Sequence, residues 1–210
     1  KALTADMIAA IGDQIYTGKV IEPKLTVTDG TPSILAAADY TVAYQDNTNV
    51  GTATVTVTAT ANANYSGTAS KNFQIIKANA DVSVTADKNS YTYGDAITLT
   101  VNVKMAKVKS AALNEVEFFC GKTSLGTASV TPKDATSGTA TLTVKTTDKK
   151  IAISAAQIIT AVYGGNKSLN EKTGTVTVTI NPKELTVSSI AEATKEYDNS
   201  NVFEDVTILY

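Results

Sequence analysis

Apolar and polar residues alternate strictly along several stretches of the chain. In residues 51–59, one set of alternate positions holds Ala53, Val55, Val57 and Ala59, and threonines hold the other set. A period of two places one set of side chains on a core and the other in water, as in antiparallel sheets. The same pattern recurs in residues 97–103, 138–145 and 174–180. These stretches predict half-buried β-strands.

Turn-forming residues separate the alternating stretches. Clusters of Gly, Pro, Asn and Asp occur at residues 29–32, 45–49, 163–166 and 198–201. These residue types favour turns because they accept left-handed backbone angles or bond their own backbone. Apolar stripes of helical period are missing, and only Ser33–Ala38 is compatible with one short helical turn. The chain is therefore predicted to be all-β.

The sequence also repeats itself. Lys1-Ala-Leu-Thr resembles Lys183-Glu-Leu-Thr, and a weaker copy begins at Lys77. About seven short strands per repeat would suffice for a β-sandwich. Because one repeat passes almost directly into the next, the short linkers favour an end-to-end rod. We expect two complete modules and the opening strands of a third, at residues 1–77, 78–182 and 183–210.

The amino-acid composition excludes several classes of catalytic and binding site. The chain has no His, which excludes Ser-His-Asp and Cys-His nucleophiles and His-ligated zinc. Its 18 basic residues are all Lys, and the net charge of -2 argues against a nucleic-acid-binding surface. One Cys cannot form an internal disulfide. No run of 18 or more apolar residues is present, so no membrane span is expected.

The two ends of the sequence begin and stop in mid-pattern. Lys1 is not followed by the charged start and apolar stretch of a secretory signal, and the last residues, 202–210, break off within an alternating run. We therefore expect the chain to be a segment of a longer protein. The lack of a signal in this segment does not indicate where the parent protein is located.

Several motifs resemble the bacterial immunoglobulin-like repeats of large cell-surface proteins. The first module carries them at residues 16–19, 21–23, 39–44, 49–57 and 64–68. The second carries a different variety at residues 93–101, 138–142 and 159–166, and Lys195-Glu-Tyr-Asp-Asn-Ser resembles the opening of a further repeat. The resemblance implies two tandem immunoglobulin-like antiparallel β-sandwiches plus the start of a third. It also implies an extracellular parent, wall-attached or secreted, and no catalytic residues.

Two groups of polar residues are candidate sites. Lys104, Lys107 and Lys109 lie in a long connection ending near Asn114, where they can attract an acidic partner or simply keep a loop soluble. Asp46, Asn47 and Asn49 have the spacing of oxygen ligands for calcium, as do Asp198, Asn199 and Asn201. Neither acidic cluster has the downstream bidentate Glu of an EF-hand, and hairpin turns use the same residues, which is the interpretation we favour.

Other polar and aromatic residues are assigned to structure. Glu115 and Glu117 share one face of a strand, and Val116, Phe118 and Cys120 hold the other, so the carboxylates are expected in water and Cys120 in the core. Carbohydrate platforms usually need exposed rings, and the chain has no Trp. Tyr16, Tyr93 and Tyr197 recur at one place in each repeat, which suggests packing at a sandwich corner.

The sequence thus favours a non-enzymatic spacer that holds distal domains away from a bacterial cell wall. It needs no cofactor, its partners are neighbouring modules of the same chain, and it is expected to be a monomer. Two alternatives stay open. One is an adhesin module that binds a host glycan or matrix protein through Lys104, Lys107 and Lys109, and the other is an accessory module of a secreted enzyme.

Overall fold

A computed structural model describes most of the chain. The described residues are 1–30, 34–61, 64–105, 114–134, 136–148, 151–185, 189–190 and 208–209. They are built from strands, with two short 3-10 helices, η1 (Ala5–Met7) and η2 (Ala37–Asp39). The prediction of an all-β chain is confirmed. The expected helical turn at Ser33–Ala38 overlaps η2, where the Asp39 side chain accepts a hydrogen bond from the Ala36 amide. The second short helix, η1, was not expected.

The amino-terminal part contains one four-stranded sheet. Its order is β1 (Gln14–Ile15), β4 (Thr68–Ile76), β3 (Gly51–Ala59), β2 (Tyr40–Gln45). β2, β3 and β4 form an antiparallel meander, whereas β1 pairs with β4 in parallel. Ala53, Val55 and Val57 on β3 are fully buried, as their alternation predicts.

Two sheets form a sandwich farther along the chain. The first has the order β10 (Thr131–Pro132), β11 (Ser137–Lys145), β7 (Ala96–Met105), β5 (Ala80–Ala86). The second has the order β6 (Ser90–Thr92), β13 (Lys172–Asn181), β12 (Ser154–Tyr163), β8 (Glu115–Cys120), β9 (Thr123–Ser129). Only β6 pairs in parallel, with the end of β13. A separate two-stranded sheet joins β14 (Ser189–Ile190) to β15 (Ile208–Leu209).

One apolar core fills the space between the two sheets of the sandwich. Every second side chain of β7 enters it, and facing residues come from β8 and β12. Its largest fully buried members are Tyr91, Tyr163 and Phe118. Close packing of this kind is the main stabilising contribution to the fold.

Fewer strands form in the amino-terminal part than the sequence predicts. Before β2, the strand pairing of the described residues is limited to β1 and isolated bridges such as Ile8 to Val27. Side chains, instead of a neighbouring strand, bond two backbone carbonyls of this region. Asn47 donates to the carbonyl of Ile21 at 3.0 Å, and Tyr44 donates to that of Pro23 at 2.5 Å.

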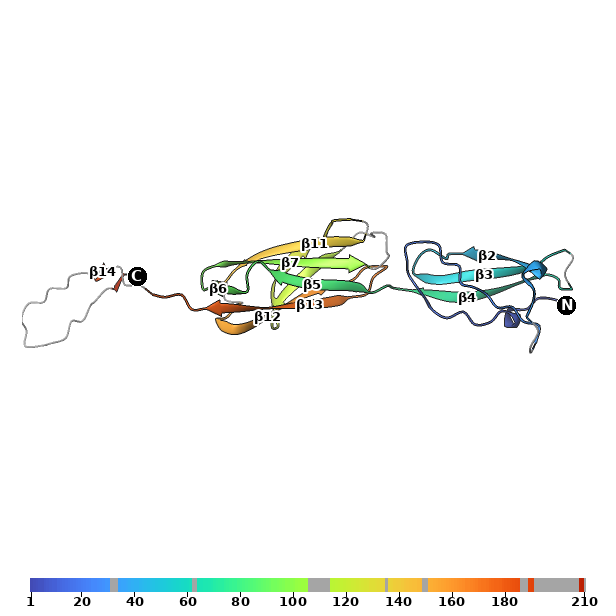
Figure 1. The fold of residues 1–210 in the computed structure, drawn as a ribbon, viewed down its shortest axis with the longest axis horizontal. Coiled ribbons are helices and arrows are strands. Elements are labelled where there is room, and N and C mark those ends of the chain that lie inside the picture. Colours follow the sequence, from blue (N-terminus) through green and yellow to red (C-terminus); the bar gives the residue numbers. More distant parts are fainter. Residues whose placement is uncertain are drawn as a thin grey trace, which may run out of the picture.

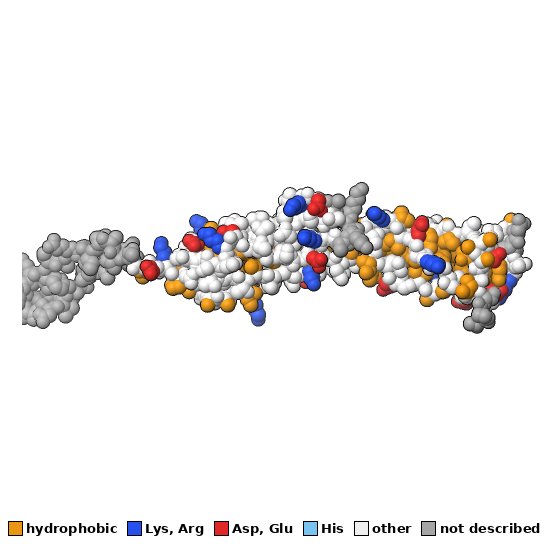
Figure 2. Space-filling model, viewed as in Figure 1, with side chains coloured by type: hydrophobic (Ala, Val, Ile, Leu, Met, Phe, Trp, Pro, Cys, Tyr) orange, Lys and Arg blue, Asp and Glu red, His pale blue; other side chains and the backbone are white. Residues whose placement is uncertain are grey.

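The two parts lie end to end along the long axis of the molecule (Figure 1). β4 ends at Ile76 and β5 begins at Ala80, so only three residues connect them. Apolar side chains gather on the visible face of the amino-terminal part, while the same face of the sandwich is mostly uncharged and polar (Figure 2). Among the described residues, no helix is long and apolar enough to cross a membrane.

Candidate functional site: the junction between β4 and β5

The connection between β4 and β5 is held by backbone hydrogen bonds to a distant turn. The Ala78 amide donates to the Ser168 carbonyl at 3.0 Å, and the Asn170 amide donates to the Ala78 carbonyl at 2.9 Å. The Asn170 side chain also donates to the Asn79 side chain at 2.9 Å. We call residues 77–79 together with the turn at 165–170 the junction. Both backbone bonds anchor Ala78 to the sandwich, which shortens the free chain between the two parts.

The turn at residues 165–170 is shaped before it meets the connection. The Asn166 carboxamide oxygen accepts from the amides of Ser168 and Leu169, each at 2.8 Å. Gly165 has a φ of +70°, and a Cβ there would lie 2.6 Å from the Leu169 carbonyl oxygen. Only glycine fits this position without a backbone shift. Leu169 is fully buried and anchors the turn in the sandwich core.

Tyr16 packs across the junction. Its amide donates to the carbonyl of Ile76, the last residue of β4, at 2.9 Å. Its half-buried side chain packs against a small core cluster that contains Phe73 and also against the core of the sandwich. One aromatic ring therefore contacts the hydrophobic clusters on both sides of the connection.

The first residues of the chain are held in the same manner. The Leu3 amide donates to the Ser66 carbonyl at 2.9 Å, and the Ser66 amide donates to the Lys1 carbonyl at 3.0 Å. Ala2 and Ser66 form a parallel bridge, like Ala78 and Leu169. Ala2 and Ala78 thus make similar backbone pairings, and the division of the chain into repeats stays a prediction.

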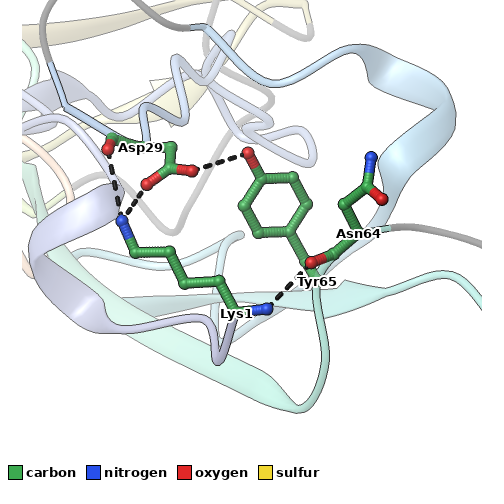
Figure 3. Close-up of polar contacts among 4 residues, drawn as sticks. All are labelled: Lys1, Asp29, Asn64 and Tyr65. Carbon is green, nitrogen blue, oxygen red and sulfur yellow. Dashed lines mark hydrogen bonds and ion pairs between the residues drawn. The ribbon is translucent and has the colours of Figure 1, made fainter.

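Side chains reinforce this amino-terminal contact (Figure 3). The Lys1 ammonium forms an ion pair with Asp29, and the Tyr65 hydroxyl donates to the same carboxylate at 2.9 Å. The hydrogen bond from Lys1, followed by that from Tyr65, lowers the pKa of Asp29. The bond to Asp29 raises the pKa of Tyr65.

The two parallel strand pairs have matching ends. β1 runs parallel to the end of β4, and the Tyr16 amide donates to Ile76. β6 runs parallel to the end of β13, and the Tyr93 amide donates to the Asn181 carbonyl at 2.8 Å. In both parts, an early strand is therefore bonded side by side with the last strand.

The tyrosines of the repeat differ in exposure. Tyr16 is half-buried, as expected of packing at a corner, whereas Tyr93 is 38% exposed. Tyr197 lies outside the described residues. The structure thus places the first two at equivalent backbone positions but with different side-chain surroundings.

Lys104 lies between two carboxylates. On β7 it is paired with Asp81 of β5 on one side and with Ser137 of β11 on the other. Asp134 accepts hydrogen bonds from the Ser137 and Thr136 hydroxyls and the Thr136 amide, which hold its pKa at about 2. These residues and Met105 line a shallow pocket of about 360 Å³.

No local spacing in the sequence indicates these acidic neighbours, because Asp81 comes from β5 and Asp134 from the connection between β10 and β11. Lys107 and Lys109 lie outside the described residues. The binding role of the three lysines stays a prediction.

The candidate calcium ligands lie in the turn between β2 and β3. Asp46 has a positive φ of 55°, which is typical of Asp and Asn in tight turns. Asn47 is engaged with Ile21: its amide group donates to the Ile21 carbonyl, and its own carbonyl accepts from the Ile21 amide at 2.9 Å. Asn49 is exposed. Asn47 thus has a structural partner, and calcium binding stays a prediction. Asp198, Asn199 and Asn201 lie outside the described residues.

Residues expected in the core or in water are placed accordingly on β8. Val116, Phe118 and Cys120 are buried, while Glu115 is exposed and Glu117 is half-buried on the opposite face. Burial raises the pKa of the Cys120 thiol, which disfavours the reactive thiolate. Within the described part of the chain, no group of three or more acidic or Cys side chains is arranged to hold a metal ion.

Comparison with known proteins identifies part of the chain. Residues 84–181 match the family model described as "Bacterial Ig-like domain (group 3)". The chain is similar to the adhesin InvE of Yersinia pseudotuberculosis, with 18% identity and a TM-score of 0.34, over 89% of this chain and 66% of that one. It is also similar to murine CEACAM1b, with 16% identity and a TM-score of 0.33, over 79% of this chain and 83% of that one. The chain thus spans just under two thirds of the adhesin chain. No curated protein matches it.

Proposed function

Residues 84–181 belong to the bacterial Ig-like domain family (group 3), and from this we propose that the chain is a load-bearing spacer of a bacterial cell-surface or secreted protein. In this proposal residues 1–77 and 78–182 are consecutive modules, and residues 183–210 open a further one. The modules are non-enzymatic and extracellular. Their task is to transmit tension and to keep other domains at a distance from the wall.

The observation that carries the proposal is the parallel pairing of early and last strands. Sheet hydrogen bonds lie roughly across the strands, so pulling the strands past one another loads several bonds together. β6 and the end of β13 have this arrangement, with the Tyr93 amide bonded to Asn181 at its end. β1 and the end of β4 repeat it. A module held in this way is expected to resist force better than its equilibrium stability alone implies, because forced unfolding is governed by the unfolding rate.

The junction supports the same proposal. A spacer keeps its length only if consecutive modules do not fold back on one another. The bonds of Ala78 anchor the start of the sandwich, and the ring of Tyr16, which packs on both sides of the connection, restricts that motion. Only three residues separate β4 from β5, which leaves little free chain at the hinge.

Single-molecule stretching of the whole chain tests the proposal. Tyr93→Pro removes the amide that bonds to Asn181, and Tyr93→Phe is the matched control because it keeps that amide. We expect Tyr93→Pro to lower the force at which the sandwich unfolds, and Tyr93→Phe to leave it near the wild-type value. Equal forces in the two variants, both verified as folded in solution, would contradict the load-bearing role of this strand pair.

An adhesive role remains the second hypothesis from the sequence. Lys104 is exposed, which an adhesive contact requires, but it shares its shallow pocket with two acidic residues, Asp81 and Asp134. A screen against glycans, mucin and matrix proteins addresses this hypothesis. Saturable binding that is lost when Lys104, Lys107 and Lys109 are replaced by Ser would contradict the spacer hypothesis and support the adhesin hypothesis.

A further inference from the structure

The strand β2 presents an open edge. It is the outer strand of the amino-terminal sheet, where it is bonded to β3, and it follows the outside of that sheet (Figure 1). Thr41, Val42 and Ala43 are exposed in succession, although Val42 points to the same side as the half-buried Tyr40 and Tyr44. Val42 itself is 40% exposed. Because no described residue pairs with this edge, the outward backbone groups of β2 and the apolar side chain of Val42 face solvent together.

The other outer strands of the described sheets carry devices that hinder pairing. β1 has two residues, β6 has three, and β10 has two with Pro132 among them. β9 has a register shift against β8. β5 carries the charged Asp81, and Gly174 of β13 approaches its backbone so closely that a Cβ would lie 2.7 Å from the Val82 carbonyl oxygen. Short length, proline, charge and bulges are the means by which natural proteins protect sheet edges.

β2 has none of these devices. Its sequence, Tyr-Thr-Val-Ala-Tyr-Gln, contains no charge and no proline. It pairs with β3 over six consecutive residues without a register shift. Asp39 and Asp46 flank the strand and mark the two ends of the neutral edge. We propose that β2 pairs antiparallel with β2 of a second copy of this chain, so that two four-stranded sheets join into one.

The choice of a second copy follows from symmetry and charge. Two identical edges can pair antiparallel about a two-fold axis, each offering the same groups to the other. Copies of one strand always carry like charges, so an uncharged strand is what self-pairing requires. A two-fold axis perpendicular to the sheet places the inner faces of both sheets on the same side of the joined sheet. Even-numbered residues of one strand then lie opposite even-numbered residues of the other. One such register sets Val42 opposite the partner's Val42.

The carboxylates of Asp39 and Asp46 make the proposed association depend on salt concentration. In the antiparallel pair, the start of β2 in one copy lies beside the end of β2 in the other. Asp39 of one copy therefore lies near Asp46 of the other. Their repulsion opposes association at low ionic strength and is screened by salt. Association through β2 is therefore expected to strengthen with added salt. This inference goes beyond the spacer proposal, since it concerns contact between neighbouring spacers, and it does not depend on the response to force.

Sedimentation equilibrium of the full chain over a wide concentration range tests the proposal. We expect the average mass to rise from that of a monomer toward twice that mass. Val42→Lys places like charges opposite each other and should keep the chain monomeric. Thr41→Lys, on the other face of the same edge, serves as a second variant in case Val42→Lys fails to fold. Thr141→Lys is the matched control, because Thr141 is exposed on β11 and has no part in this edge.

Hydrogen exchange locates the contact. Amides of Thr41–Gln45 that point away from β3 should exchange more slowly at high than at low concentration in the wild type, but not in Val42→Lys. A wild-type chain that stays monomeric at every concentration and salt level overturns the proposal. A dimer that persists in both Val42→Lys and Thr41→Lys also overturns the proposal, as does a dimer that is lost in Thr141→Lys. In either case the interface lies outside β2.

Discussion

Gly174 on β13 lies against the backbone of Val82 on β5, so that a Cβ at position 174 would stand 2.7 Å from the Val82 carbonyl oxygen. This contact joins the edges of the two sheets of the sandwich. A methyl group has no room there, and close-packed interiors respond to such an insertion by shifting backbone.

Gly174→Ala is therefore expected to destabilise the sandwich by about 1–3 kcal/mol. Urea unfolding followed by circular dichroism measures the change. Gly164→Ala is the control, because a Cβ at position 164 meets nothing within 4 Å. Equal midpoints for the two variants would show that the sheets can separate at this edge without cost.

Tyr91 makes the sandwich sensitive to alkali. Its buried hydroxyl donates to Asp87 at 2.8 Å, and burial, followed by this bond, raises its pKa from 10.0 to about 12. The folded state thus holds the phenol proton more tightly than the unfolded chain. The resulting stability is fully present below pH 10 and is lost as the pH rises toward about 12.

Tyr91→Phe removes this contribution. We expect the free energy of unfolding of the wild type to fall more steeply than that of Tyr91→Phe between those two pH values, while near neutral pH the variant is the less stable. Chemical unfolding at a series of pH values measures both. Parallel curves in the alkaline range would contradict the assigned pKa.

Asn166 shapes the turn that holds the junction. Asn166→Ala removes the acceptor of two amide hydrogen bonds, those of Ser168 and Leu169. We expect a loss of roughly 1–2 kcal/mol in stability and faster exchange of the Ala78 amide, whose acceptor is the Ser168 carbonyl. Asn166→Asp keeps a side-chain acceptor and should be much milder. Unchanged exchange at Ala78 in Asn166→Ala would show that the junction does not depend on this turn.

Asn47 distinguishes turn chemistry from calcium binding. Because its side chain donates to the Ile21 carbonyl, Asn47→Ala should lower the thermal midpoint to the same extent with calcium and with a chelator. The structural interpretation is wrong if calcium stabilises the wild type and this gain disappears in Asn47→Ala. Thermal unfolding in the two buffers provides the measurement.

The two candidate regions differ in how much of their structure the sequence pattern predicts. The alternation on β8 correctly predicted Cys120 in the core, because the pleat of a strand sends neighbouring side chains to opposite faces. The lysine cluster is a different case. Its three members are close in sequence, but Asp81 of β5 and Asp134 of the connection between β10 and β11 line one pocket with Lys104, and no local spacing encodes that arrangement.

The local residue pattern correctly predicts that the fold is all-β and that the alternating apolar residues of β3 and β7 are buried. These follow from local rules, since strand period and turn chemistry act over a few residues. Tertiary structure alone decided that β6 lies parallel to the end of β13, that Tyr16 contacts two cores and that β2 keeps an open edge. Those features depend on which distant strands pair, and pairing is set by the packing of the whole sheet rather than by any one segment.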